Sequence, residues 1–253
     1  MRIWLLLLFC LLAVVPQSLA APVVLFDEGH GQPFHVRGNG PLDLSQLAER
    51  FAANGFEVRT TTGALDAEPL DGVTTLVISG AFRPLSSGEL AAVRTFLGGG
   101  GSVVVMLHIA PPLGGVLDLL HVDYANGILH DGSRAIDNNP QYIRVDRLAS
   151  HPLTEGLMDF AVYGCWALRG TAPPVEPVAW TSAQGWVDLV PDGQPGPGDV
   201  RGPFAVAVAG HVAAGRYVVF GDDALFQNRF LEGSNRLLAD NLARWLSRRT
   251  SSD

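Results

Sequence analysis

Val23-Val24-Leu25-Phe26-Asp27-Glu28-Gly29-His30-Gly31 is the stretch around which the rest of the chain is organised. Its apolar half is continuous rather than alternating, which is typical of a strand that is buried on both faces of a parallel sheet. Its polar half follows at the point where such a strand leaves the sheet. In open parallel α/β sheets, ligands bind at this carboxyl edge. The stretch therefore predicts an α/β fold with a site at one edge of its sheet.

Three later apolar runs also end in polar residues, at Ser79-Gly80, at His108 and at Gly221-Asp222-Asp223. In the first part of the chain, strand patterns alternate with helical patterns. Strand patterns lie at 56–60, 74–79 and 102–107, and helical patterns lie at 45–54 and 86–97. This alternation predicts a doubly wound, flavodoxin-like, mostly parallel sheet with helices on both faces. The remaining chain predicts a β-rich insertion at roughly 109–150 within a single α/β domain spanning 21–250.

The composition excludes several classes of mechanism and partner. The chain has 253 residues and a formal net charge of −8, and all 17 of its basic residues are arginine. Without lysine, the chain has neither a lysine for a Schiff base nor the lysine of a phosphate-binding P-loop. The acidic balance argues against nucleic acid and anionic membranes as partners.

Residues 1–20 have the pattern of a secretory signal peptide. Arg2 precedes an apolar core at 3–15, and Ser18-Leu19-Ala20 forms a small-x-small cleavage pattern. We therefore expect a periplasmic or secreted protein that meets the membrane only through this segment. An uncleaved membrane anchor is the alternative. After cleavage Cys165 is the only cysteine, so no intramolecular disulfide is expected.

The polar endings supply candidate functional side chains. An acid and a histidine on one loop can act as a general base with its orienting group, or as metal ligands. The same residues can instead cap backbone amides at the end of a strand. His108 can be a base, a metal ligand or a core histidine, and the two acids of the last ending can orient a histidine or cap a short helix. The candidates are Asp27, Glu28, His30, His108, Asp222, Asp223 and Asn228.

A second acidic stretch mimics a calcium-binding loop. Asp188, Asp192 and Asp199 occupy positions 1, 5 and 12 of the motif, and Gly193 occupies position 6. Position 3 is Val190, which cannot ligate a metal. The pattern favours a plain turn rich in Gly and Pro, and these acids are weak candidates for a metal site. No cofactor is predicted, although a divalent metal remains compatible with the histidines and acids.

Several segments resemble a known superfamily. The run 97–102 precedes a strand pattern that ends in Leu107-His108, the segment 151–157 reads His-Pro-Leu-Thr-Glu-Gly-Leu, and 219–226 is followed by Asn228 and a helix at 234–247. These segments resemble the class I glutamine-amidotransferase-like superfamily. The likeness is to its trehalose-utilisation-type branch and to a bacterial branch related to auxiliary proteins of gliding-motility ABC transporters. The resemblance implies an amidotransferase-like fold.

The chain departs from that superfamily at the catalytic position. Amidotransferases carry a Gly-x-Cys-x-Gly elbow after the fourth strand, whereas this chain has Leu107-His108-Ile109, and the usual His-x-Glu pair is absent near the C-terminus. The resemblance therefore implies a domain without glutamine hydrolysis, used for binding or assembly. We expect an exported protein that binds a small polar ligand or an envelope protein at the carboxyl edge. The alternatives are a metal-dependent hydrolase acting on a carbohydrate or amide, and an envelope assembly scaffold associated with a transporter.

Overall fold

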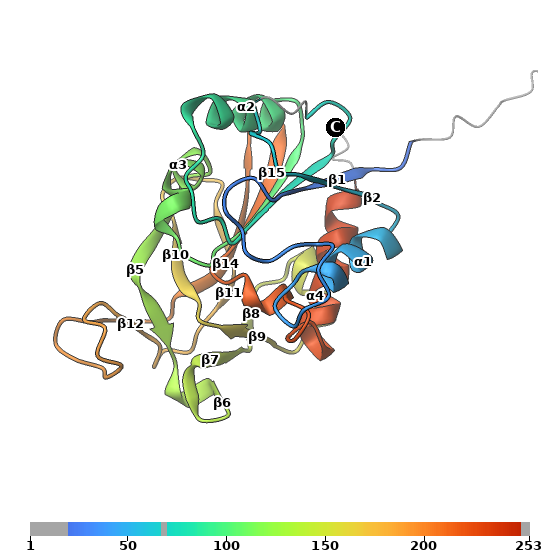
Figure 1. The fold of residues 1–253 in the computed structure, drawn as a ribbon. Coiled ribbons are helices and arrows are strands. Elements are labelled where there is room, and N and C mark those ends of the chain that lie inside the picture. The colour runs from blue at the N-terminus through green and yellow to red at the C-terminus, as the bar shows by residue number, and fades with distance from the viewer. Residues whose placement is uncertain (1–19, 67–69, 249–253) are drawn as a thin grey trace, which may run out of the picture.

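The computed structural model describes residues 20–66 and 70–248, and its core is one large sheet. The N-terminal elements alternate between strand and helix (Figure 1). They are β1 (Val23–Asp27), α1 (Ser45–Ala53), β2 (Glu57–Thr61), β3 (Thr75–Ser79), α2 (Ser87–Gly98), β4 (Ser102–Met106) and α3 (Gly114–Leu119).

Between α3 and the last helix, the regular elements are strands and three short 3-10 helices, at Gly132–Arg134, Pro152–Thr154 and Ala224–Phe226. The strands are β5 (Val122–His130), β6 (Ala135–Ile136), β7 (Asn139–Val145), β8 (Arg147–Leu148), β9 (Phe160–Tyr163), β10 (Trp166–Gly170), β11 (Glu176–Trp180), β12 (Trp186–Asp188), β13 (Val200–Arg201), β14 (Ala205–Val212) and β15 (Gly215–Phe220), and the helix is α4 (Gly233–Ser247).

Five strands form a parallel block in the order β2-β1-β3-β4-β15. Every residue of β1, β3, β4 and β15 is buried, because apolar side chains on both faces of these strands pack against other elements. One face packs with α1 and α4 in a cluster that includes Phe26 and Phe51. The opposite face packs with α2 and α3 in a cluster that includes Leu25 and Val93 (Figure 1).

The predicted fold class is wrong, because the parallel block is only part of the sheet. From β15 the sheet continues through β14, β10, β5, β12 and β13 with antiparallel pairings, and β11 and β8 add to it in the same sense. The result is a mixed, mostly antiparallel sheet of 12 strands, not a doubly wound parallel sheet.

Short connections explain why the second half of the sheet is antiparallel. Val212 pairs with Gly215 across a loop of two residues, and Ala213 there has a φ of 53°. A loop of this length can join only antiparallel strands, whereas a parallel pair needs a crossover of a dozen residues or more. The prediction extended the helix-crossover pattern of 22–108 to a region in which hairpins replace the crossovers.

A smaller sheet of three strands, β6-β7-β9, packs beside the large one. Residues of the predicted insertion at 109–150 are divided between the two sheets, with β5 in the large sheet and β7 in the small one. The outer edge of β9 is closed by side chains. Oδ1 of Asn235 accepts a hydrogen bond from Ala161 N at 2.8 Å, and Nδ2 of Asn235 donates to Ala161 O at 3.0 Å.

The predicted signal peptide lies almost entirely outside the described residues, so its assignment stays a prediction. Within 20–66 and 70–248, none of the helices combines the length and the apolar character that a membrane crossing requires.

Candidate functional site

The carboxyl ends of β1, β3, β4 and β15 lie along one edge of the parallel block, because neighbouring parallel strands end on the same side. The polar endings of these strands are therefore neighbours in space. Side-chain contacts divide these polar residues into two groups, one centred on His30 and one centred on His108.

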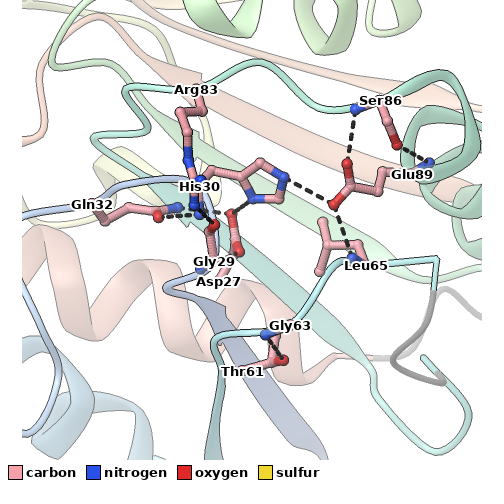
Figure 2. A network of polar contacts seen from close by, with 10 residues as sticks. All are labelled: Asp27, Gly29, His30, Gln32, Thr61, Gly63, Leu65, Arg83, Ser86 and Glu89. Atoms are coloured by element: carbon pink, nitrogen blue, oxygen red, sulfur yellow. Dashed lines mark hydrogen bonds and ion pairs between the residues drawn. The ribbon is translucent and has the colours of Figure 1, made fainter.

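His30 forms the centre of a buried network (Figure 2). Its Nδ1 lies 2.7 Å from Oδ2 of Asp27, and its Nε2 lies 2.9 Å from Oε1 of Glu89 in α2. Asp27 also accepts hydrogen bonds from Gly29 N and from Nε2 of Gln32. Both ring nitrogens of His30 are thus held by carboxylates, and the ring has no nitrogen left for a ligand.

The electrostatics of this network favour a charged imidazolium between two carboxylates. The hydrogen bond to Asp27 raises the pKa of His30 above its ordinary value of 6.5, against the lowering effect of burial. Burial alone would raise the pKa of Glu89, but the backbone N–H groups of Ser86 and Leu65, the Ser86 hydroxyl and His30 outweigh it and lower that pKa from 4.5 to about 2. The network ties the loop after β1 to the first turn of α2, which is a structural role.

Glu28 contacts other partners than the His30 network. Its Oε1 accepts a hydrogen bond from Val36 N at 2.9 Å, and its Oε2 lies 3.5 Å from Nδ1 of the exposed His35. Glu28 therefore shapes the loop that follows β1.

His108 and Asp223 form a dyad at the ends of β4 and β15. Nδ1 of His108 lies 3.1 Å from Oδ1 of Asp223, whose side chain is 1 % exposed, whereas the side chain of His108 is 40 % exposed. A carboxylate can only accept, so Nδ1 carries the proton of this hydrogen bond. Nε2 then points away from the dyad, as a hydrogen-bond acceptor when the ring is neutral and as a donor when the ring is charged.

Two phenylalanine rings flank the imidazole of His108. The ring centroid of Phe34 lies 5.6 Å from that of His108, and the centroid of Phe82 lies 5.3 Å from it. Phe82 is 43 % exposed, which is unusual for so large an apolar side chain. The surface around Nε2 therefore combines one polar group with two apolar walls.

Gly80 allows the close approach of Asp223 to the end of β3. Gly80 has a φ of +61°, and a Cβ built on it would lie 2.6 Å from Oδ2 of Asp223. Oδ2 of Asp223 and Oγ of Ser79 are both buried and form no hydrogen bond with the described residues. The dyad is thus accompanied by buried oxygen atoms that lack a hydrogen-bond partner among the described residues.

Asp223 and Asp222 both raise the pKa of His108, with Asp223 as the larger cause. The hydrogen bond to Asp223 raises the pKa of His108, against the lowering effect of burial. Burial and the neighbouring Asp223 raise the pKa of Asp222 from 3.8 to about 7. Asp222 itself is fully enclosed: its Oδ2 accepts from Tyr163 N at 2.6 Å and its Oδ1 from Ala224 N at 2.9 Å. It is a structural residue behind the dyad rather than part of the surface.

Asn228 also has a structural position. Its Oδ1 accepts a hydrogen bond from Gln46 N at 3.0 Å, and its Nδ2 donates to Gly40 O and to the Ser45 hydroxyl. These bonds join the chain after β15 to the loop that begins α1.

The weak metal candidates are engaged by backbone amides of their own loop. Asp188 Oδ2 accepts from Gly193 N, Asp192 Oδ1 from Gln194 N, and the two carboxylate oxygens of Asp199 from Leu189 N and Gly196 N. Across residues 20–66 and 70–248, no three His, Cys, Asp or Glu side chains are grouped closely enough to hold a metal ion. Cys165 is fully buried, and burial raises the pKa of its thiol well above the ordinary range.

The sequence interpretation missed three residues that define these two groups, namely Glu89, Phe34 and Phe82. It named Gly80 at a strand end but did not predict the close approach of Asp223 to that glycine. The spacing of Ser86 and Glu89 signals a capping box, which the structure contains, and this spacing marks Glu89 as a buried acid of α2. The positions of the two phenylalanines depend on loop conformation, for which the sequence gives no signal.

A large cavity lies at the opposite edge of the sheet. It has a volume of about 1230 Å³ and is lined by Thr74, Ser102 and Arg216 at the amino ends of β3, β4 and β15. We assign the candidate site to the His108 surface on chemistry, because the cavity contains no pair of groups comparable to the dyad.

Solved structures similar to this chain show the same fold at low sequence identity. The mmIFT52 N-terminal domain has a TM-score of 0.71 at 16% identity, and the match covers 89% of this chain and 97% of that one. A putative ThuA-like protein from Bacteroides uniformis ATCC 8492 has a TM-score of 0.55 at 18% identity, covering 94% and 98% of the two chains. A cytoplasmic protein from Salmonella typhimurium LT2 has a TM-score of 0.59 at 11% identity, covering 90% and 100%. At these identities the likeness concerns the fold alone.

No curated protein matches the sequence significantly. The predicted membership of the class I glutamine-amidotransferase-like superfamily is wrong, since the family that matches is a different one and the sheet is mixed and mostly antiparallel. The amidotransferase-like and doubly wound α/β descriptions that followed from that resemblance are corrected with it. The match to the domain of unknown function DUF4350 covers residues 33–243, and the chain belongs to this family.

Proposed function

We propose that the protein binds a small polar ligand at the carboxyl edge of its parallel block, through Nε2 of His108. The observation that carries the proposal is the contrast within the dyad: the carboxylate of Asp223 is buried, whereas the imidazole that it orients is half-exposed. A buried acid that fixes one ring nitrogen and leaves the other facing solvent is an arrangement typical of binding and catalytic histidines.

The chemistry of the surface indicates which ligand groups fit. Because Asp223 raises the pKa of His108, the imidazolium is favoured, and Nε2–H then donates a hydrogen bond to an acceptor on the ligand. Phe34 and Phe82 supply apolar contact on two sides. The ligand is therefore an acceptor-bearing molecule with an apolar portion. The other candidates from the sequence, Asp27, Glu28, His30, Asp222 and Asn228, have the structural contacts described above and are not assigned to the binding surface.

Nuclear magnetic resonance of the histidine rings tests the proposal. Acetate, inorganic phosphate and glucose serve as probes of a carboxylate, a phosphate and a hydroxyl acceptor. We expect a saturable shift of the His108 ring resonances with at least one probe, and loss of that response in His108→Gln with an unchanged melting temperature. His121, which is exposed elsewhere on the molecule, is the internal control. Equal, non-saturating shifts of both rings would contradict binding at His108.

We also propose that the protein is exported, on the strength of residues 1–20 alone. N-terminal sequencing of the protein recovered from the producing cells tests this, because cleavage after Ala20 leaves a chain that begins at Ala21. Recovery of the intact N-terminus in the cytoplasmic fraction would contradict it.

A further inference from the structure

A free edge of the large sheet carries exposed apolar side chains. β13 is the last strand in the sheet order and pairs only with β12 among the described strands. Val200 in this strand is 50 % exposed, and Leu189 and Val190 in the adjoining loop are 39 % and 54 % exposed. Figure 1 shows that this loop projects from the body of the molecule beside β12. Natural sheets protect such edges with charges, prolines or covering segments, and an apolar free edge is a site for strand pairing.

The hydrogen-bond pattern of β13 shows which backbone groups face outward. Gly202 N donates to Gly185 O, and Val187 is paired with Val200. In an antiparallel ladder, residues alternate between bonding the partner strand and facing away from it. Gly202 and Val200 therefore bond toward β12, and Arg201 between them presents its backbone groups at the free edge.

The side chains around Val200 are self-complementary. In an antiparallel pair centred on Val200, Val200 lies opposite Val200 of a second copy, and Arg201 lies opposite Asp199 of that copy. The symmetry then creates two identical contacts between opposite charges and one apolar contact on the axis. We propose that β13 pairs with β13 of a second copy of this chain, extending the large sheet across a two-fold axis.

The loop that precedes β13 is built to hold this edge in place. Both carboxylate oxygens of Asp199 are bonded to the loop, at 3.0 Å to Leu189 N and 2.6 Å to Gly196 N. Each oxygen keeps a lone pair that can accept from an arginine. A loop held in its bound conformation loses little freedom on pairing, which favours association. The contact is short, so the dimer is weak and depends on protein concentration.

A cysteine at the axis gives a direct test. In the proposed pair the two Val200 residues are not bonded to one another through their backbones, and their Cα atoms then lie about 4.5 Å apart, within the range of a disulfide. The full chain with Val200→Cys and oxidised glutathione is expected to form a covalent dimer of twice 26.9 kDa. The native Cys165 is buried, and Cys10 is replaced by Ser in every variant, so that neither native thiol interferes. The matched control is Arg59→Cys on β2, an exposed position at the other edge of the sheet, which is expected to remain monomeric.

Analytical ultracentrifugation of the unmodified chain gives an independent readout. The apparent mass is expected to rise with concentration from 26.9 kDa toward twice that value, and Arg201→Glu, which places an acid opposite Asp199, is expected to abolish the rise. A mass of 26.9 kDa at every concentration from about 1 µM to about 1 mM overturns the proposal, as does equal crosslinking of the two cysteine variants.

Discussion

Nε2 of His30 lies 2.9 Å from Oε1 of Glu89, and this contact joins the loop after β1 to the start of α2. The two residues are separated widely in sequence, and both side chains are almost completely buried. Because Asp27 holds the other ring nitrogen, the histidine acts as a charged crosslink between two acids (Figure 2).

Replacement of His30 by Gln is expected to destabilise the protein by about 3 kcal/mol, because it leaves Asp27 and Glu89 as buried charges without a cation. Urea unfolding measures the change. His35→Gln is the control: that ring is 48 % exposed and lies 3.5 Å from Glu28, so its loss is expected to cost about 0 to 1 kcal/mol. Equal effects of the two substitutions would show that the His30 network contributes no more to the free energy of unfolding than the exposed pair of His35 and Glu28.

The same network predicts how stability depends on pH. The pKa of His30 is raised in the folded state, so its contribution is fully present below 6.5 and is lost as the pH rises through the folded pKa. The pKa of Glu89 is lowered from 4.5 to about 2, so its contribution is present above 4.5 and is lost as the pH falls toward 2. The difference in unfolding free energy between wild type and His30→Gln is therefore expected to be largest between 4.5 and 6.5 and to shrink above that window. A difference that is constant up to high pH would be inconsistent with a charged His30.

Asp223→Asn is expected to lower the pKa of His108, because the hydrogen bond to Asp223 is the main cause of its raised value and burial acts in the opposite direction. Titration of the His108 ring by nuclear magnetic resonance measures the shift. The ring of exposed His121, observed in the same spectra, is the internal reference. If the pKa of His108 does not move, then the dyad does not exist in solution.

Asn235→Ala is expected to destabilise the protein by about 3 kcal/mol, since it removes hydrogen bonds to both backbone groups of Ala161 and to Leu225 O. Faster amide exchange at Ala161 is the local readout. Asn54→Ala removes a half-buried amide at the C-terminal end of α1, which donates to Arg50 O and to Asp240, and is expected to cost about 1 kcal/mol without affecting Ala161. Unchanged protection of Ala161 would mean that Asn235 does not close the edge of β9.

The local elements of residues 22–107 could be predicted because each signal is local. The continuous apolar run of β4 and the capping pattern of Ser86 in α2 need no knowledge of the rest of the chain. The order of strands in a sheet is a different kind of property. β14 and β15 are antiparallel because a loop of two residues joins them, and this loop contains Ala213 rather than a glycine or asparagine that would signal such a turn.

The candidate site shows the same division. The chemistry-bearing residues at the strand ends were visible in the sequence, but their partners were not. His30 and His108 follow the ends of β1 and β4, which β3 separates in the sheet. Glu89 lies against the second ring nitrogen of His30, whereas no ion pair with the second ring nitrogen of His108 is found among the described residues. This difference depends on packing between segments that are distant in sequence, and only the three-dimensional structure reveals it.

The place of β15 in the sheet has a consequence for synthesis on the ribosome. This strand lies between β4 and β14, although it comes near the end of the chain, and it is the only bridge between the parallel and antiparallel halves of the sheet in the described residues. A nascent chain that has emerged as far as α3 therefore exposes the apolar edge of β4 until most of the remaining residues have been translated. The parallel block cannot be completed until β15 has been translated. We therefore expect the N-terminal half to be the part of the molecule that depends most on chaperones.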